Sequence, residues 1–408
     1  MIQSVNPIPA FDIKQQYTTI EAEVSAAVLE VLASGRYIGG PLVEGFEQQF
    51  AAYNTVTECV ACNSGTDALY LALRVLDVGA GDEVITTPFT FIATSEVISA
   101  VGAKPVFVDI DATTFNLDVE QVAAAITPKT KAIIPVHLFG QPVDMTSLIA
   151  IAQSHNLSII EDCAQSTGAI WAGEKVGSIG HIGCFSFYPT KNLGGCGDGG
   201  AITTNDPAIA TKLRILRDHG SKIRYLHEEI GVNSRLDALQ AAILQIKLRY
   251  LDIWNDRRRD IANYYYQYLS QVPGIVPPQE LPGGSGVWNQ YTIRISGEGR
   301  NGSSAKYREW VRSQLQEQGV SSMIYYPHPL HLQPVYQSLG YEIGDLPIAE
   351  QACHEVISLP MFPELTQQQQ DQVIYALKDC WAEGSGGAEG AEGQRGRGAG
   401  EQGRIINN

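Results

Sequence analysis

The fold is decided by four short apolar runs, Glu83-Val84-Ile85-Thr86-Thr87, Pro105-Val106-Phe107-Val108-Asp109, Ala132-Ile133-Ile134-Pro135-Val136 and Leu157-Ser158-Ile159-Ile160-Glu161. Each run is rich in β-branched residues and lacks polar alternation, which is typical of strands covered on both faces of a parallel sheet. The segments between the runs carry their apolar residues at helical spacing. This alternation of strands and helices predicts an α/β fold with a mostly parallel central sheet in a large domain.

The rest of the chain predicts two further parts. From Arg235 to about Leu269 there are few helix breakers, and we expect this long helix to lead into a smaller α+β lobe. The large domain, with an N-terminal segment, is therefore expected over residues 1–250 and the small C-terminal domain over residues 251–382. Residues 383–408 are rich in Gly, Ala and Glu and have almost nothing apolar to bury, so they predict a flexible low-complexity tail.

The composition argues against several classes of protein. The chain has 408 residues, and 28 Lys and Arg stand against 44 Asp and Glu, which gives a formal net charge of −16. This acidic surplus repels nucleic-acid phosphates and anionic membrane surfaces. The start of the chain has no basic region followed by an apolar one, and no apolar run reaches about 18 residues. Seven scattered cysteines fit a reducing compartment. We therefore expect a cytoplasmic protein that binds neither nucleic acid nor membranes.

The segment Asn63-Ser64-Gly65-Thr66-Asp67-Ala68-Leu69 follows a strand-like run and opens a helix. Glycine and hydroxyl residues at a helix N-terminus offer free N–H groups and the positive end of the helix dipole, which suit an anion such as phosphate. The same residues can form an ordinary N-cap, in which Ser or Thr accepts a hydrogen bond from the first turn. Alone, the segment leaves both interpretations open.

Asp162 follows the last of the four runs and falls at the carboxyl end of a buried strand, where open α/β sheets bind their ligands. A carboxylate in this place can pair with a protonated ring nitrogen of a cofactor. Aspartate at a strand end also commonly caps the next helix, and that interpretation remains open as well.

Lys191 lies in the segment Phe185-Ser186-Phe187-Tyr188-Pro189-Thr190-Lys191-Asn192-Leu193-Gly194-Gly195. A lysine becomes a nucleophile when its amine is neutral, which requires desolvation or nearby positive charge. Most lysines are solvated on the surface instead. The aromatic and apolar neighbours of Lys191 argue against that more common placement.

One glycine pattern and one cysteine pattern resemble functional motifs, but we do not expect them to bind a dinucleotide or a metal. Gly195, Gly197 and Gly200 match the dinucleotide spacing G-x-G-x-x-G, but this run leads into a strand-like segment rather than opening a helix. Cys59 and Cys62 have the spacing of a redox or zinc pair, but no second pair or nearby His completes a metal site. On a strand the two thiols point to opposite faces, so we expect packing residues and no metal.

The three polar segments together define one chemistry. A phosphate seat, a strand-end aspartate and a buried lysine, in that order, meet the requirements of pyridoxal phosphate (PLP). The phosphate anchors the cofactor, Asp162 keeps the pyridine nitrogen protonated, and Lys191 forms the Schiff base.

From Ile8 to about Leu377 the chain also resembles the DegT/StrS-type nucleotide-sugar aminotransferases, which are fold-type I PLP enzymes of the aspartate aminotransferase superfamily. The resemblance rests on long segments in a fixed order. They are Ser34-Gly35-Arg36-Tyr37-Ile38-Gly39-Gly40-Pro41, Ser64 to Leu69, Pro88-Phe89-Thr90-Phe91, Glu161-Asp162-Cys163-Ala164-Gln165, Phe185 to Gly194, Gly231-Val232-Asn233-Ser234-Arg235-Leu236-Asp237 and Tyr326-Pro327-His328-Pro329-Leu330-His331-Leu332-Gln333.

The resemblance implies further contacts around Asp162 and Lys191. Asn233 is expected to reach the cofactor phosphate of the neighbouring subunit, which implies a homodimer with a shared active site. The remaining cofactor contacts are Gly65, Thr66 and Ser186 to the phosphate, Phe91 stacked on the pyridine ring and Gln165 near the ring hydroxyl. The candidate substrate contacts are Tyr326, His328 and His331, each of which can equally be a packing or loop residue.

The activity implied is transfer of an amino group from an amino acid, by resemblance L-glutamate, to a nucleotide-linked keto sugar in amino-sugar biosynthesis. A subgroup that replaces the lysine with histidine performs dehydration, and Lys191 is present here. The alternatives are another fold-type I PLP enzyme such as a lyase, and a non-catalytic sensor or regulator. The intact set of Lys191, Asp162 and Gln165 argues against the sensor, because a sensor need not keep a proton-shuttling amine.

Overall fold

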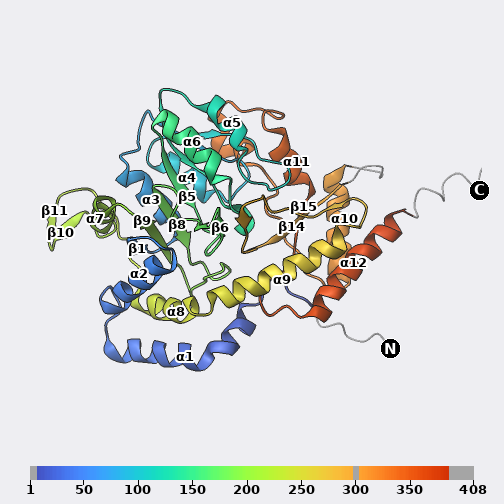
Figure 1. The fold of residues 1–408 in the computed structure, drawn as a ribbon, viewed down its shortest axis with the longest axis horizontal. Helices are drawn as coiled ribbons and strands as arrows, with labels where there is room; N and C mark the ends of the chain where they lie inside the picture. The colour runs from blue at the N-terminus through green and yellow to red at the C-terminus, as the bar shows by residue number, and fades with distance from the viewer. Residues whose placement is uncertain (1–6, 297–302, 386–408) are drawn as a thin grey trace, which may run out of the picture.

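A seven-stranded sheet forms the centre of the protein (Figure 1), for which the computed structural model describes residues 7–296 and 303–385. All strands run parallel except β9, which is antiparallel to both neighbours. The predicted α/β class with a mostly parallel sheet is confirmed, and each of the four predicted strands is present within two residues of its expected bounds. In sheet order the strands are β1 (Glu58–Cys62), β9 (Gly200–Thr204), β8 (Ile182–Ser186), β5 (Ser158–Asp162), β4 (Thr130–Ile134), β2 (Glu83–Thr86) and β3 (Lys104–Phe107).

Helices cover both faces of this sheet, so its strands are buried on both sides. One face packs against α3 (Gly65–Val75), α4 (Ala93–Ala100) and α7 (Pro207–Leu216). The other face packs against α2 (Pro41–Tyr53), α5 (Val119–Ala125), α6 (Met145–His155) and α8 (Ala238–Leu248). Cys62 belongs to the core on the first face and Cys59 to the core on the second, as their placement on a strand predicts.

A second core lies in the C-terminal lobe, toward which α9 runs from the end of α8 (Figure 1). A three-stranded antiparallel sheet packs there against helices. Ile8 joins this core, because it is 1% exposed and its backbone pairs with Gly319 and Ser321. The start of the chain therefore packs with the small lobe, while the domain bounds of 1–250 and 251–382 stay a prediction. The elements are α9 (Leu251–Leu269), β12 (Ile275–Val276), β14 (Tyr291–Ile295), α10 (Ser304–Glu317), β15 (Val356–Leu359) and α12 (Gln367–Ser385).

The remaining elements connect or border these two cores. A small sheet pairs β13, from the C-terminal half, with β6 of the N-terminal half, and β10 and β11 form a separate hairpin. These elements are α1 (Ile13–Ser34), the 3₁₀ helix η1 (Leu138–Gly140), β6 (Ile170–Trp171), β7 (Glu174–Lys175), β10 (Ser221–Ile223), β11 (Leu226–His227), β13 (Gly284–Ser285), the 3₁₀ helices η2 (Leu330–Leu332) and η3 (Pro334–Leu339), and α11 (Pro347–Glu355).

Two sequence expectations need correction. The single helix predicted from Arg235 to Leu269 is two helices, α8 and α9, that break at residues 249–250, where Arg249 and Tyr250 both donate hydrogen bonds to Glu23 of α1. Helix α12 continues through Ser385, so the first three residues of the predicted 383–408 tail are helical. The rest of that tail, residues 386–408, lies outside the described residues.

No helix in the described part of the chain is long and apolar enough to span a membrane.

An aromatic cluster beneath β8 predicts a large effect of one substitution. The Phe50 ring lies edge to face with Phe185 at 5.0 Å and with Phe187 at 5.4 Å between centroids. Phe50→Ala should lower the free energy of unfolding by about 3–5 kcal/mol, because it leaves a cavity in a fully buried site. Tyr375→Ala, at a side chain that is 67% exposed, is the control. Thermal melting checks the prediction, and equal melting temperatures for the two variants would contradict it.

Candidate active site

A cavity of about 460 Å³ opens at the carboxyl ends of β5 and β8, within the usual size range for small-molecule sites. Seven of the eight predicted cofactor contacts line it, and so does the predicted substrate contact Tyr326. The predicted residues in its wall are Gly65, Thr66, Phe91, Asp162, Gln165, Ser186, Lys191 and Tyr326.

The N-terminus of α3 forms one end of this cavity. The Oγ of Ser64 accepts the Asp67 N–H at 3.1 Å, so the capping interpretation of this segment is correct for Ser64. The first amides of any helix have no partner inside that helix. A Cβ placed on Gly65 would lie 2.6 Å from the Cβ of Ser186, so only glycine lets the end of β8 approach α3 this closely. The Ser186 hydroxyl and the first turn of α3 therefore surround one point, which suits an anion.

The Asp162 carboxylate is buried at the end of β5, where it is 5% exposed. Its Oδ2 accepts the Thr94 hydroxyl at 2.9 Å and its Oδ1 accepts the Ala164 N–H at 3.1 Å. Desolvation nevertheless raises the pKa of Asp162, against the opposing effects of these hydrogen bonds and of Lys191. A buried carboxylate with a raised pKa favours a cationic partner, and a protonated ring nitrogen is such a partner.

Lys191 lies in the turn after β8, where its N–H donates to the Tyr188 carbonyl at 2.8 Å. Its side chain is only partly exposed. Desolvation lowers the pKa of Lys191 to about 8, while the Asp162 carboxylate acts in the opposite direction. An appreciable fraction of this amine is therefore neutral near neutral pH, which nucleophilic chemistry requires.

Gln165 is held rigidly between two other parts of the wall. Its Oε1 accepts the Phe139 N–H at 2.6 Å, and its Nε2 donates to the Tyr326 hydroxyl at 3.1 Å. Burial raises the pKa of Tyr326, so its hydroxyl stays protonated and can also donate to a ligand. These contacts fix the orientation of the amide and of the phenol.

Three predicted site residues lie outside the wall of the cavity in this chain. Asn233 is exposed and its backbone forms a bridge with Asp218. His328 is exposed in the loop before η2. His331 is 1% exposed, its Nε2 lies 3.2 Å from Glu350 and its ring packs against Tyr341, so its side chain is buried outside the wall of the cavity.

Several residues of the wall were not predicted. Tyr188 and Thr190 belong to the segment around Lys191, so their adjacency to that lysine was a usable signal. Thr94 stands among several hydroxyl residues after β2, and nothing in the sequence singles it out. Gln290 and Tyr325 come from the C-terminal half, and their approach depends on how the two cores pack.

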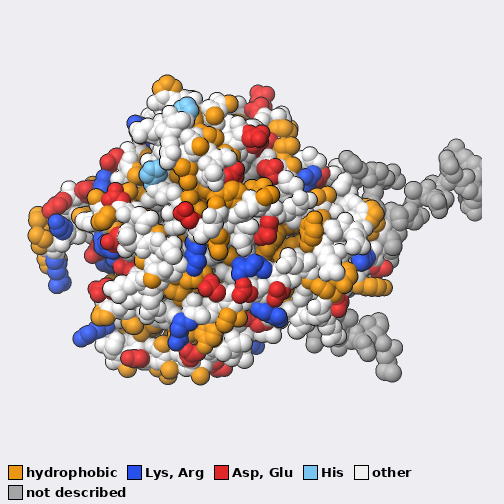
Figure 2. Space-filling model, viewed as in Figure 1, with side chains coloured by type: hydrophobic (Ala, Val, Ile, Leu, Met, Phe, Trp, Pro, Cys, Tyr) orange, Lys and Arg blue, Asp and Glu red, His pale blue; other side chains and the backbone are white. Residues whose placement is uncertain are grey.

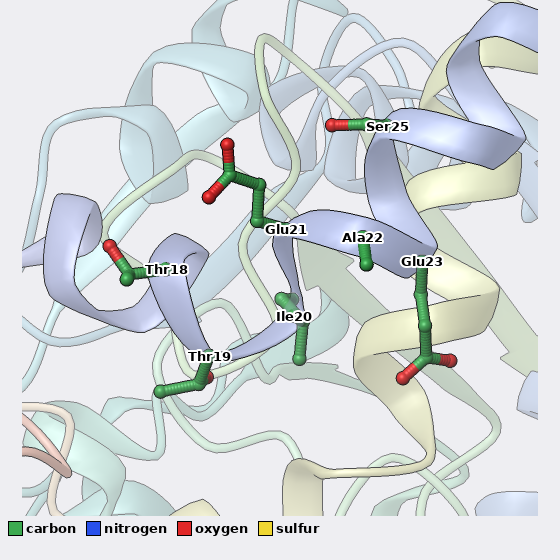
Figure 3. Close-up of a pocket in the computed structure, with 7 residues that line it drawn as sticks. All are labelled: Thr18, Thr19, Ile20, Glu21, Ala22, Glu23 and Ser25. Carbon is green, nitrogen blue, oxygen red and sulfur yellow. The ribbon is translucent and has the colours of Figure 1, made fainter.

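Two other places in the fold are poorer candidates. A hollow of about 520 Å³ beside α1 is lined by residues 18–23 and Ser25 of that one helix, whose side chains point apart (Figure 3). His137, Glu161 and Cys163 form a buried cluster with metal-ligand chemistry. Both carboxylate oxygens of Glu161 already accept backbone N–H groups, and one of them also bonds to His137, so hydrogen bonds account for this cluster.

The residues around the cavity fit PLP. The α3 N-terminus with Ser186 suits the phosphate, Asp162 is a buried carboxylate that favours a cation, and Lys191 is an amine with a lowered pKa. All three groups face one cavity large enough for a small molecule.

Known proteins are similar in sequence to this chain along most of its length. The model of the DegT/DnrJ/EryC1/StrS aminotransferase family matches residues 18–378. A pleiotropic regulatory protein of Geobacillus stearothermophilus is 49% identical over 92% of this chain and 98% of its own. A UDP-N-acetyl-3-dehydro-alpha-D-glucosamine 3-aminotransferase of Acidithiobacillus ferrooxidans is 44% identical over 91% of this chain and 97% of its own.

Solved structures agree with the fold. The crystal structure of S. venezuelae DesV in complex with a ketimine intermediate is 45% identical, with a TM-score of 0.88 over 93% of this chain and 99% of that one. The structure of NtdA from Bacillus subtilis with bound cofactor PMP is 31% identical, with a TM-score of 0.85 over 93% of this chain and 86% of that one.

The lowered pKa of Lys191 predicts a distinctive pH dependence. In the cofactor-free protein the reaction of Lys191 with fluorodinitrobenzene should accelerate as the pH rises through about 8. A free lysine amine requires a pH of about 10.4, because only the neutral amine reacts. Peptide mass spectrometry with Nα-acetyl-lysine as reference measures both rates. Asp162→Asn removes the charge that raises the pKa, so its profile should move to lower pH. A wild-type profile that follows the free amine would contradict the assignment.

Proposed function

This chain belongs to the DegT/DnrJ/EryC1/StrS aminotransferase family, and we propose that it transfers an amino group from L-glutamate to a nucleotide-linked keto sugar. It is a PLP-dependent aminotransferase. The observation that carries the sugar proposal is one cavity that combines a lysine of lowered pKa with a buried aspartate, in a chain 44% identical to a UDP-sugar 3-aminotransferase. The pathway we propose is amino-sugar biosynthesis for a polysaccharide or a secondary metabolite.

The cofactor site is proposed as follows. When bound, PLP supplies a carbonyl that takes up the amino group and a ring that delocalises negative charge. The first turn of α3 and Ser186 hold the phosphate, Phe91 covers the ring, and Gln165 lies near the ring hydroxyl. Asp162 contacts the ring nitrogen and keeps it protonated, since a buried carboxylate is stabilised by a cation at hydrogen-bond distance.

Lys191 is the proposed catalytic acid and base. Once its amine is free, the lowered pKa lets it accept a proton from the α-carbon of the amino donor. The same group, then an ammonium, would return this proton, so Lys191 would act first as a base and then as an acid. The keto sugar then enters, and Lys191 performs the two proton transfers in reverse order.

Two residues of the C-terminal half are proposed for the substrate. The Tyr326 hydroxyl lines the cavity and stays protonated, so it can donate to a sugar oxygen. His328 is exposed in the same loop and can contact the nucleotide part. The buried His331 is left out of this proposal.

We propose that the enzyme is a homodimer in which Asn233 reaches the phosphate of the partner's cofactor. Asn233 is exposed and does not line the cavity of its own chain. A hollow of about 570 Å³ between α1 and α2 has exposed Tyr37, Ile38 and Leu42 in its wall, and a second chain would bury these side chains. Figure 2 shows hydrophobic and basic side chains together at the left edge, where the β10–β11 hairpin lies.

A cytoplasmic location is also part of the proposal. In the described part of the chain no disulfide joins any of the seven cysteines, and six of them are buried, which suits a reducing compartment. A regulatory role is a second candidate function, because the Geobacillus relative has the name of a regulatory protein. Such a role predicts PLP binding without turnover.

Absorption spectroscopy tests the aminotransferase proposal. The PLP-loaded protein should show a visible band that bleaches with L-glutamate and returns with 2-oxoglutarate, because the amino group moves on and off the cofactor. Lys191→Ala should abolish turnover and retain some cofactor. A band that responds to no amino donor would favour the regulator or a lyase, and turnover by the alanine variant would remove Lys191 from its role.

A mixing experiment tests the shared site. Lys191→Ala and Asn233→Ala subunits, co-expressed with different tags, form a heterodimer with one site that has both Lys191 and the partner subunit's Asn233 and one site that has neither. We expect about half of the wild-type activity per dimer, well above either variant alone. If Asn233 served its own subunit, neither site would be complete and no activity would return.

A further inference from the structure

Gln290 carries a buried acceptor without a partner at the wall of the active-site cavity. Its side chain lines this cavity together with Thr190 and Lys191. Among the described residues no group donates a hydrogen bond to its Oε1, although that atom is buried. An unsatisfied buried carbonyl oxygen is costly, and in a binding cavity the missing donor is most simply supplied by a ligand.

The backbone before Gln290 is held in an unusual conformation. Trp288 has φ of +47°, in the left-handed region that a bulky residue rarely adopts. The buried Arg258 secures this segment, because its Nη1 donates to the carbonyls of Trp288 at 3.1 Å, Asn289 at 3.3 Å and Met361 at 3.2 Å. Backbone strain of this kind persists only where the surrounding structure enforces it, and it is concentrated at ligand sites.

The neighbouring residue connects this segment to the lysine loop. The Nδ2 of Asn289 donates to the Thr190 carbonyl at 3.2 Å and to Oδ1 of Asn192 at 2.8 Å, on either side of Lys191. The N–H of Gln290 donates to the Phe139 carbonyl at 3.4 Å. The backbone of Gln290 is therefore fixed relative to Lys191 and to Phe139, which orients Gln165, so its side chain enters the cavity wall from a defined position.

We propose that Gln290 binds a hydroxyl group of the sugar, an inference that rests on the proposed function. The Oε1 needs a donor, and a sugar hydroxyl supplies one. The carboxylates of L-glutamate have only acceptors, and its amino group is engaged in the reaction with the cofactor. The amide Nε2 can in turn donate to a second sugar oxygen. Gln290 thus discriminates between the two substrates of the enzyme: it contributes to binding of the sugar and not of the amino donor.

The test measures the two half-reactions separately. Bleaching of the visible band is followed in single turnovers with L-glutamate, and again with UDP- or dTDP-linked 3-amino sugars, which run the sugar half-reaction in reverse. Gln290→Leu should raise the concentration of amino sugar at half-maximal rate by about tenfold or more, because a buried hydrogen-bond partner is lost. The corresponding value for L-glutamate should stay within about twofold. Gln290→Glu keeps an acceptor oxygen and should lose less than the leucine variant.

Controls separate the possible failures. Gln279→Leu changes an exposed glutamine away from the cavity and should leave both half-reactions unchanged. Melting temperatures of the cofactor-free variants report folding, and Gln290→Glu serves if the leucine variant is unstable. Equal losses for both substrates, or none for either, would overturn the assignment of Gln290 while leaving the proposed function intact. A wild-type enzyme that responds to L-glutamate but to no amino sugar would overturn both.

Discussion

The burial of the Asp162 carboxylate is the constraint on which the rest of the site depends. The backbone of Asp162 is held in the sheet, with its N–H bonded to the Pro135 carbonyl and its own carbonyl accepting the His137 N–H. Its side chain is held by Thr94 of α4 and by the N–H of Ala164 in the turn after β5. The carboxylate cannot turn toward solvent without breaking its hydrogen bonds. The free-energy cost of burying its charge must therefore be offset inside the cavity, and a cationic ligand offsets it.

The opposed pKa shifts of Asp162 and Lys191 follow from the same burial. Desolvation raises the pKa of the acid and lowers that of the amine, so it makes both charges less favourable. Their mutual attraction offsets only part of this effect. The two groups therefore suit a ligand with a cationic group for the Asp162 carboxylate and a carbonyl group for the neutral Lys191 amine. In the proposed cofactor site, local N–H groups and hydroxyls bind the phosphate, so an anionic ligand is compatible with a net charge of −16.

The sequence was informative wherever function depends on position along a strand or a helix. The β-branched runs predicted the sheet, Asp162 follows from its place at a strand end, and Gly65 follows from its place at a helix start. Thr94 and Gln290 could not be predicted, because their roles arise from packing between elements far apart in the chain. The break at Arg249 and Tyr250 was missed for the same reason: no helix breaker marks it, and the bonds to Glu23 come from α1.

Residues from both cores form the cavity wall. The residues that suit the cofactor and the residues proposed for the substrate come from different parts of the chain. The residues that suit the cofactor come from the ends of β5 and β8, the start of α3 and, for Phe91, the loop between β2 and α4, all of which adjoin the large sheet. Tyr325, Tyr326 and Gln290 come from the C-terminal half and approach from the other side. Chemistry that is common to aminotransferases needs only the first group. In the proposed function, substrate choice therefore depends on the second group, and it can change while Asp162 and Lys191 stay in place.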